Sequence, residues 1–539
     1  MKTVFSFLAS LLLLISGNAQ TIGLLQHNAG SNDQGYILFA PISSNTTYLI
    51  DHCGKQIHTW NSNYHPGQAV YLLEDGTLLR TGNKNNTTFT AGGKGGIIEK
   101  YNWNGTLLWT YTISDTNQCQ HHDVKALPNG NVLVISWERK TKAEAIAAGR
   151  NPSLCPNYLW SEKIIELQAQ GTNNATIVWE WHLWDHLVQD YDNTKANYGV
   201  VANSPNKVNI NYNSSATQSD WIHLNAIDYN ASLNQILLSS HAFSEIWIID
   251  HSTTTTQASG NVGGNANLGG DLLYRWGNPS AYNNNATQQL FGQHSAHWLN
   301  NTGEILLFNN GLNRTGGNYS SVDKIQTPLT NYNYTASLPF LPNAASILYN
   351  ANNTHNYYAQ NISNAQLLNN KNILLCNGPA GAFIEVDSNE NTVWAYTNPV
   401  YNGGVLAQNT TPTQNQVFRA YYYDKSYSAF NGKVLTASTT IENSNPLSEN
   451  CVLTATQAND ITNEAQRVFP NPFSDHIYLT ASKAEMNFKL YNLMGQTIVQ
   501  GNTKSLSDFD FSQLAPGTYL IQLIDTRGTK TLRVVKSLP

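Results

Sequence analysis

The chain has 539 residues, of which 41% are hydrophobic and 11% aromatic, and its formal net charge is −6. This length and composition allow a large hydrophobic core and indicate a globular protein with more than one part. Charged residues make up only 12% and include no basic run, which excludes a protein that tracks a nucleic-acid backbone.

The first residues predict export. Lys2 is followed by an apolar run from Val4 to Ile15 and then by the small residues around Ala19, which is the order found in signal peptides. We assign residues 1–19 to a signal peptide and expect the mature chain to begin at Gln20. No later stretch reaches the roughly 18 to 20 apolar residues of a membrane span, so none is expected.

Short strands recur about six times between residue 20 and about residue 440. Each unit has a first half in which an apolar strand that ends near Asp and Gly precedes a strand that holds Trp. These halves occupy residues 48–60, 97–111, 163–168 with 176–181, 246–250 with 272–277, a weak copy at 321–325, and 383–396. The second halves occupy residues 71–82, 126–136, 227–240, 298–311, 366–378 and 418–423. With hardly any helical periodicity outside about Lys142 to Ala148, the pattern predicts an all-β fold, a six-bladed β-propeller. A sandwich or a parallel β-helix is the alternative.

Three second halves begin with a histidine at nearly the same position: His122, His223 and His294. Equivalent strands of a propeller surround one axis, so we expect the three imidazoles to meet in the central channel. Such a cluster either binds a metal or performs nucleophilic and acid–base chemistry on an anion. The nearby amides of Asn225 and Gln293 favour the anion.

Five cysteines are widely spaced and form no CxxC pair: Cys53, Cys119, Cys155, Cys376 and Cys451. A thiolate metal site is therefore not expected. Export permits one or two disulfides, the odd number leaves at least one cysteine unpaired, and the pairing stays open.

The C-terminal part is predicted as a polar linker, residues 441–466, and a small β-sandwich, residues 467–539. Six strands are expected in HIYLTAS, MNFKLYNLMG, TIVQG, DFDFSQL, GTYLIQLI and KTLRVVK. RVFPNPFSDHIYL, LAPGTYLIQL and TLRVVK resemble the C-terminal sorting domain of the Bacteroidetes type IX secretion system. The resemblance implies that this secretion machinery is a partner and that the protein leaves the periplasm to be secreted or held at the cell surface. A carbohydrate-binding sandwich is the alternative.

Motifs from Ile22 to Asp424 resemble the bacterial arylsulfate sulfotransferases. They include QHHD (120–123), DWIHLNAIDY (220–229), QHSAHWLNNTGEILLFNNG (293–311) and FIEVDSNENTVWAYTNP (383–399). The resemblance implies a six-bladed propeller in which a histidine takes a sulfuryl group from an aryl sulfate donor and passes it to a phenolic acceptor. It implies no cofactor and no metal.

Carried over by motif, the nucleophile is His294. The DWxHxN motif places His223 and Asn225 at the site, and the HHD motif places His122 there or, as the second choice, His121. One position departs from the family, because its usual arginine is replaced by His241. Protonated His241, Arg314 or Arg419 could bind the sulfuryl group instead, or the donor preference differs.

Two other functions remain open from the sequence. The first is a metal-dependent propeller lyase or hydrolase of polysaccharides, with His122, His223 and His294 as ligands. The second is a non-catalytic secreted propeller that serves adhesion or glycan binding.

Overall fold

The computed structural model describes residues 20–453 apart from 29, 336, 352, 353 and 355, and residues 468–537 apart from 472, 480–486, 493–495, 503–508 and 526–527. The chain divides after Val452 into two compact units, which are described separately. The expected signal peptide, residues 1–19, lies outside the described residues. None of the described helices is long and apolar enough to cross a membrane.

Six antiparallel sheets make up the first unit. In order from the first strand outward, the first sheet contains β31 (Val417–Asp424), β2 (Gly35–Pro41), β3 (Thr46–Ile50) and β4 (Gln56–Asn61), and the second contains β5 (Pro66–Leu72), β6 (Leu78–Asn83), β7 (Gly96–Tyr101) and β8 (Leu107–Thr112). The third sheet contains β9 (Gln118–Ala126), β10 (Val132–Thr141), β11 (Tyr158–Gln170) and β12 (Asn174–His182), and the fourth contains β15 (Leu224–Asn230), β16 (Gln235–Ser240), β17 (Glu245–Asp250) and β18 (Tyr274–Trp276). The fifth sheet contains β19 (His294–Trp298), β20 (Glu304–Asn309), β21 (Ser321–Gln326) and β24 (Ser346–Tyr349), and the sixth contains β25 (Asn364–Leu367), β26 (Ile373–Asn377), β27 (Ala382–Val386), β28 (Thr392–Thr397) and β1 (Gly23–His27).

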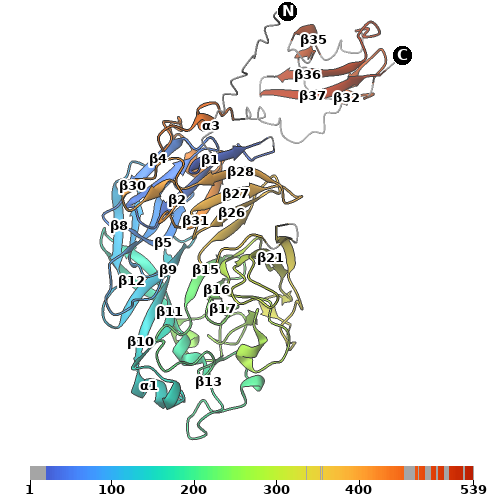
Figure 1. Cartoon of the computed structure of the whole chain (residues 1–539). Helices are drawn as coiled ribbons and strands as arrows, with labels where there is room; N and C mark the ends of the chain where they lie inside the picture. The colour runs from blue at the N-terminus through green and yellow to red at the C-terminus, as the bar shows by residue number, and fades with distance from the viewer. Residues whose placement is uncertain are drawn as a thin grey trace, which may run out of the picture. The chain divides into compact units, whose positions relative to one another are not determined.

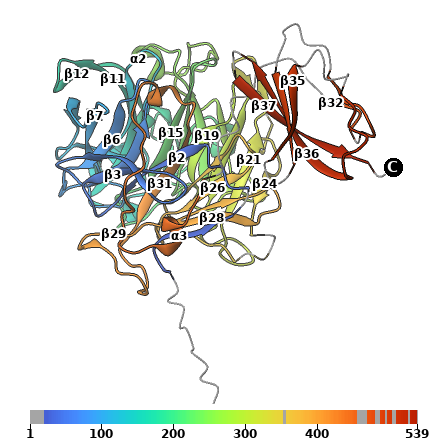
Figure 2. The same ribbon diagram turned by 90° about the horizontal axis from the view of Figure 1, so that it is seen from above.

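The first strands of the six sheets form a closed ring. Each contacts the first strand of the next sheet, and β31 contacts β5 to complete the circle. Residues from all six also line one cavity of about 350 Å³, which therefore lies on the ring axis. This arrangement is a six-bladed β-propeller, as the repeats predicted. Figure 2 shows β15 and β19, the first strands of neighbouring blades, side by side.

Two distant parts of the chain complete the first blade. Strand β31 pairs with β2, although nearly the whole propeller separates them in sequence (Figure 1). The predicted first halves of the repeat form the outer strands of each blade, and the second halves form the inner strands. Every residue of β16 and β17 is buried, because both faces of a blade pack against its neighbours.

Short elements connect the blades. The helices are α1 (Lys142–Ala147), α2 (Thr255–Ala258), α3 (Pro446–Glu449), η1 (Pro152–Leu154), η2 (Leu183–His186), η3 (Val201–Asn203), η4 (Pro279–Tyr282) and η5 (Ser428–Phe430), and the short strands are β13 (Leu187–Val188), β14 (Val208–Asn209), β22 (Leu329–Thr330), β23 (Asn333–Tyr334), β29 (Val400–Tyr401) and β30 (Gly404–Val405). Helix α1 is where the sequence predicted one, and Thr141 and Glu144 cap its N-terminus reciprocally.

The segment 441–452 belongs to the propeller, whereas the sequence assigned it to the linker. Glu442, Asn445 and Ser448 are buried there despite their polarity. The Asn445 side chain accepts a hydrogen bond from the Ser448 backbone N–H at 2.9 Å and thereby caps α3. A disulfide between Cys53 and Cys451 then fastens the end of the segment to the first blade.

We expect Cys451→Ser to lower the free energy of unfolding of the propeller. The disulfide joins residues 398 apart, so it restricts the unfolded chain strongly, and its loss should remove about 2 to 5 kcal/mol. Urea denaturation measures the change. Cys155→Ser is the control, because Cys155 is buried but its thiol is free. An equal loss in both variants would contradict a role for the cross-link.

The second unit is a small β-sandwich. Its strands are β32 (Val468–Phe469), β33 (Tyr478–Leu479), β34 (Asn487–Tyr491), β35 (Thr497–Asn502), β36 (Gly517–Asp525) and β37 (Gly528–Lys536), in a two-stranded sheet and a four-stranded sheet of order β35-β34-β36-β37. Its buried apolar core includes Phe473, Phe488 and Phe511.

One predicted strand of this unit, DFDFSQL, was wrong in its described part, residues 509–514. The Asp510 side chain accepts a hydrogen bond from the Ser512 backbone N–H at 2.8 Å, which bends the chain into a turn. Phe511 is buried from this turn. The sixth strand comes instead from RVF, as β32.

Candidate active site

Four imidazoles lie in one row at the start of the inner strands. His122 and His223 have ring centroids 4.6 Å apart, the His223 and His241 centroids are 5.3 Å apart, and those of His241 and His294 are also 5.3 Å apart. The three histidines that the repeat placed at one position are thus brought together. His241, which follows β16, fills the space between two of them.

The backbone at these positions is strained in the same way in three blades. His122, His223 and Ser295 have φ of 51°, 54° and 56°, in the left-handed region that non-glycine residues rarely adopt. Each lies in or beside a β-bulge at the beginning of an inner strand. A bulge re-aims side chains, and strain of this kind is concentrated at functional sites.

His294 is held in one tautomer. Its Nδ1 lies 2.8 Å from Oδ1 of Asn310, whose Nδ2 donates to the carbonyls of Ala359 at 2.8 Å and Ile362 at 3.1 Å. These carbonyls fix the Asn310 amide with its oxygen toward the ring. Nδ1 of His294 therefore carries the proton, and Nε2 carries the lone pair. Burial, with His241 beside it, holds the pKa of His294 well below its usual value, so the ring is neutral.

His223 has the opposite electrostatics. Burial lowers its pKa, but contact with the Asp220 carboxylate outweighs burial and raises the pKa above the usual value. Nδ1 of His223 lies 2.5 Å from Oδ2 of Asp220, and the indole N–H of Trp137 donates to Oδ1 at 3.2 Å. The row thus combines a neutral imidazole, His294, with His223, whose protonated form the Asp220 carboxylate stabilises.

His121 supports the row from outside it. Its ring stacks on Trp137 with centroids 3.9 Å apart, and its Nε2 lies 2.8 Å from Oε2 of Glu162. Its Nδ1 is 2.9 Å from Nδ1 of His122, so it orients that ring. Burial holds the pKa of both histidines well below the usual value.

His241 does not replace the family arginine as a cation. Burial lowers its pKa to about 3, so its ring is neutral at ordinary pH. Its protonated form, one of the options that the sequence left open, is therefore not supported. A neutral imidazole can still donate one hydrogen bond.

The two candidate arginines lie in different places. Arg419, on β31, donates to Asp123 at 2.8 Å and to the carbonyl of Asn225 at 2.8 Å, so it underlies the histidine row. Arg314 lies over the rings of Phe291 and Tyr319 and donates to Ser321 at 3.0 Å. None of these Arg314 contacts is with the four imidazoles.

Asn225 is buried beneath the row. Its Nδ2 donates to the carbonyl of Gln293 at 2.7 Å, and its Oδ1 has no partner among the residues described. The amide thus stabilises the backbone just before His294 and keeps one N–H for another acceptor. Sequence reasoning missed Asn310, although it stands in the LLFNNG segment of the quoted motif.

We expect Asn310→Leu to reduce turnover about 10²-fold, because the proton of His294 would no longer be fixed on Nδ1. Asn310→Asp keeps an acceptor at the same place but adds a negative charge. Asn310→Asp should retain more activity than Asn310→Leu. It should also raise the pKa of His294, so the acidic limb of the pH–rate profile should move to higher pH. Equal losses with no change of profile would indicate a structural effect alone.

Gly93 lies against the His122 ring. Its φ is +82°, and a Cβ built on it would overlap the imidazole. Gly93→Ala should therefore displace His122 and lower turnover at least 10-fold, whereas Gly92→Ala should not, because a Cβ there meets nothing within 4 Å. Steady-state rates of the two variants compare them. A Gly93→Ala enzyme of full activity would show that His122 is not needed in this position.

Residues 26–427 match the model of the arylsulfotransferase (ASST) family, and residues 467–537 match that of the secretion system C-terminal sorting domain. No curated protein matches the chain. Similar solved structures include a protein of unknown function from Bacteroides caccae, 12% identical over 72% of this chain and 98% of its own, with a TM-score of 0.39. Virginiamycin B lyase from Staphylococcus aureus is 10% identical over 71% of this chain and 90% of its own, with a TM-score of 0.31. The propeller fold is assigned from the observed order of the strands in the sheets and not from these distant similarities.

The sheets define a six-bladed propeller, and four histidines from its inner strands and the turns beside them form a row of imidazoles. The chain belongs to the arylsulfotransferase family, since the family model matches well over half of it. Membership implies sulfate ester substrates. The sorting domain indicates export through a secretion machinery, to the outside or the cell surface.

Proposed function

We propose that the protein moves a sulfuryl group from a phenolic sulfate ester to a phenol by a ping-pong reaction through Nε2 of His294. The observation that supports it best is the pairing of a neutral, tautomer-fixed imidazole with a cationic one in a single row. A nucleophile needs its lone pair, and the leaving group needs a proton.

In the first half-reaction the lone pair of His294 Nε2 forms a bond to sulfur, and the bond from sulfur to the phenolic oxygen breaks. The electron pair leaves on the oxygen, which takes the proton of His223. His122 and His241 donate N–H groups to the sulfuryl oxygens, and Asn225 has an N–H for the same charge. In the second half-reaction the acceptor phenol returns a proton to His223, and its oxygen displaces Nε2 from sulfur.

The metal-dependent alternative has no support in the geometry. Within the described parts of the chain, no group of three or more His, Cys, Asp or Glu residues is arranged to hold a metal ion. The assay below includes a chelator so that it also tests this alternative.

The test is incubation of the purified protein with 4-nitrophenyl sulfate in EDTA, with and without phenol. We expect nitrophenol to accumulate continuously only with phenol present, and phenyl sulfate to form in equal amount. Without phenol, one equivalent of nitrophenol per protein should be released as the sulfuryl group stays on the enzyme. Release that water alone sustains would indicate a sulfatase, and loss of activity in EDTA would indicate a metal enzyme.

A further inference from the structure

The axial cavity begins beside the row of reactive imidazoles. Its lining includes Asp123 and Ser295, which directly follow His122 and His294 in the chain, and extends along the inner strands to residues such as Lys125, Asp228 and Trp298. At about 350 Å³ it has the size of a small-molecule site. The sulfuryl chemistry does not use it.

The charges of this cavity cancel. Nζ of Lys125 lies 2.7 Å from Oδ1 of Asp228, and a nitrogen of Arg419 lies 2.8 Å from Oδ2 of Asp123. Two cations and two carboxylates therefore line the cavity as close pairs. Such a lining offers little attraction to an ion and favours an uncharged ligand.

Polar atoms remain for that ligand. Nε of Arg419 and Nε1 of Trp298 are buried donors without a hydrogen-bond partner in the described chain, and both side chains line the cavity. His297 directs its Nδ1 proton to the carbonyl of Ser295 at 2.9 Å, which makes its Nε2 an acceptor. A ligand with hydroxyl groups satisfies donors and acceptor alike, because a hydroxyl does both.

Aromatic rings form part of the wall. Tyr71 and Tyr421 have ring centroids 5.2 Å apart, and both hydroxyls accept hydrogen bonds from Arg419, at 3.0 and 3.1 Å. With the hydroxyls engaged, the rings and the Trp298 indole contribute mainly apolar surface. Apolar ring surface beside polar groups suits the C–H face and the hydroxyl edge of a sugar ring.

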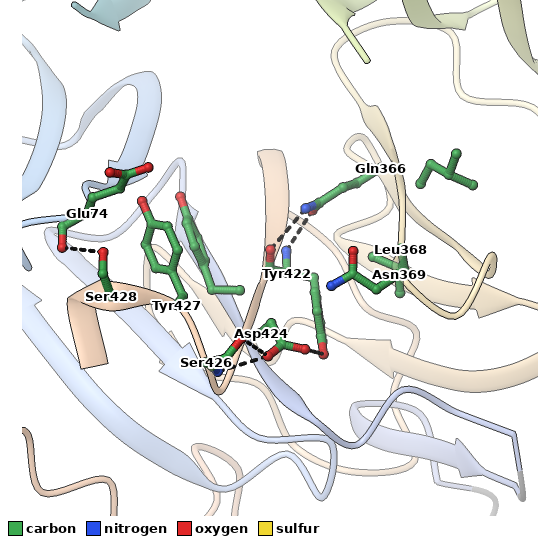
Figure 3. Close-up of a pocket in the computed structure, with 11 residues that line it drawn as sticks. Glu74, Gln366, Leu368, Asn369, Tyr422, Asp424, Ser426, Tyr427 and Ser428 are labelled. Atoms are coloured by element: carbon green, nitrogen blue, oxygen red, sulfur yellow. Dashed lines mark hydrogen bonds between the residues drawn. The ribbon is translucent and has the colours of Figure 1, made fainter. Parts of the chain in front are cut away.

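Two further cavities extend the site. One of about 580 Å³ shares Tyr71 and Lys125 with the axial cavity, and one of about 600 Å³ shares Glu74, Tyr423 and Tyr427 with the second. Figure 3 shows this outermost cavity with Tyr427 and Glu74 on one side and Gln366 and Asn369 on the other. Together the three neighbouring cavities offer more space than a single sugar ring fills.

We propose that these three cavities bind a neutral oligosaccharide, with one sugar in the axial cavity and the following sugars along the other two. The binding site is distinct from the site of the sulfuryl chemistry, because none of the four imidazoles of the row lines these cavities. It would hold the exported enzyme on an uncharged glycan while the histidine row stays open to its small substrates.

The test is binding of the full-length protein to an array of neutral oligosaccharides, among them cellohexaose, xylohexaose, laminarihexaose and mannohexaose, with dextran sulfate as the charged comparison. We expect at least one neutral glycan to bind and dextran sulfate not to compete. Trp298→Ala should weaken that binding about 10-fold or more. Trp298→Phe keeps a ring but loses the N–H, so its affinity for the glycan should lie between those of the unchanged protein and Trp298→Ala.

Two controls separate this site from other effects. Trp184→Ala removes an indole that lies over Lys140 in another part of the propeller, and it should leave glycan binding unchanged. His294→Ala should also bind the glycan normally, while Trp298→Ala should still transfer sulfuryl groups. No bound neutral glycan, binding of dextran sulfate alone, or unchanged binding by Trp298→Ala would each overturn the proposal.

Discussion

His294→Ala is expected to abolish sulfuryl transfer, with a loss on the order of 10⁴-fold or more. The reason is that, in the proposed reaction, Nε2 of His294 forms the covalent bond to sulfur, so its loss removes the nucleophile. The measurement is 4-nitrophenol release with saturating phenol, together with intact-protein mass after donor alone. The mass gain of one sulfuryl group should appear in the unchanged protein and be absent from the variant.

The matched control is His297→Ala, which removes an imidazole from the same strand, β19, three residues along the chain. His297 lines the axial cavity and is not part of the row of four imidazoles, so its variant should keep most of the activity. Added imidazole should partly restore His294→Ala, because the vacated space can take a free nucleophile. Activity above one tenth of normal in His294→Ala would rule out the covalent route.

Much of the fold was predictable, because a blade repeats in the sequence. The alternation of buried strands and the turns between them indicated six units, and the recurring histidine at the start of three units indicated their convergence. The prediction that the histidines converge depends on the strand register, because a shift of one residue would turn His122 away from the axis. The left-handed bulges that aim the histidines could not be predicted, since non-glycine residues carry them.

The chemistry within the site could be predicted only in part. Residue types indicated a nucleophile and anion donors, but the charge of each imidazole depends on burial and on neighbours from other blades. Asp220, in the segment before β15, meets Trp137 of β10 from 83 residues away in the chain. Asn310 is oriented by carbonyls about fifty residues away. The segment after residue 440 looked like a linker because its buried residues are polar, and only their contacts show that it packs on the propeller.

Asp220→Asn should move the alkaline limb of the pH–rate profile to lower pH. In the unchanged protein Asp220 raises the pKa of His223 above its usual value of about 6.5, so the ring keeps its proton to a higher pH than a free imidazole and loses it as the pH rises through the raised value. Without the carboxylate charge, burial is unopposed and lowers that pKa. Turnover at pH 7 should then fall about 10²-fold, because the leaving phenolate lacks its proton donor.

The acidic side provides the internal check. Burial holds the pKa of His294 well below about 6.5, so the nucleophile stays neutral and no acidic limb should appear near that pH in either protein. Asp228→Asn is the control, because its carboxylate pairs with Lys125 in the axial cavity and not with a histidine of the row. The alkaline limb of its pH–rate profile should stay in place.

Two donors with different leaving groups distinguish an electrostatic effect of Asp220 from a structural one. A donor with a less acidic phenol depends more on protonation of the leaving oxygen, so Asp220→Asn should slow the reaction of phenyl sulfate more than that of 4-nitrophenyl sulfate. Equal slowing of the two donors would mean that Asp220 only holds the backbone in shape.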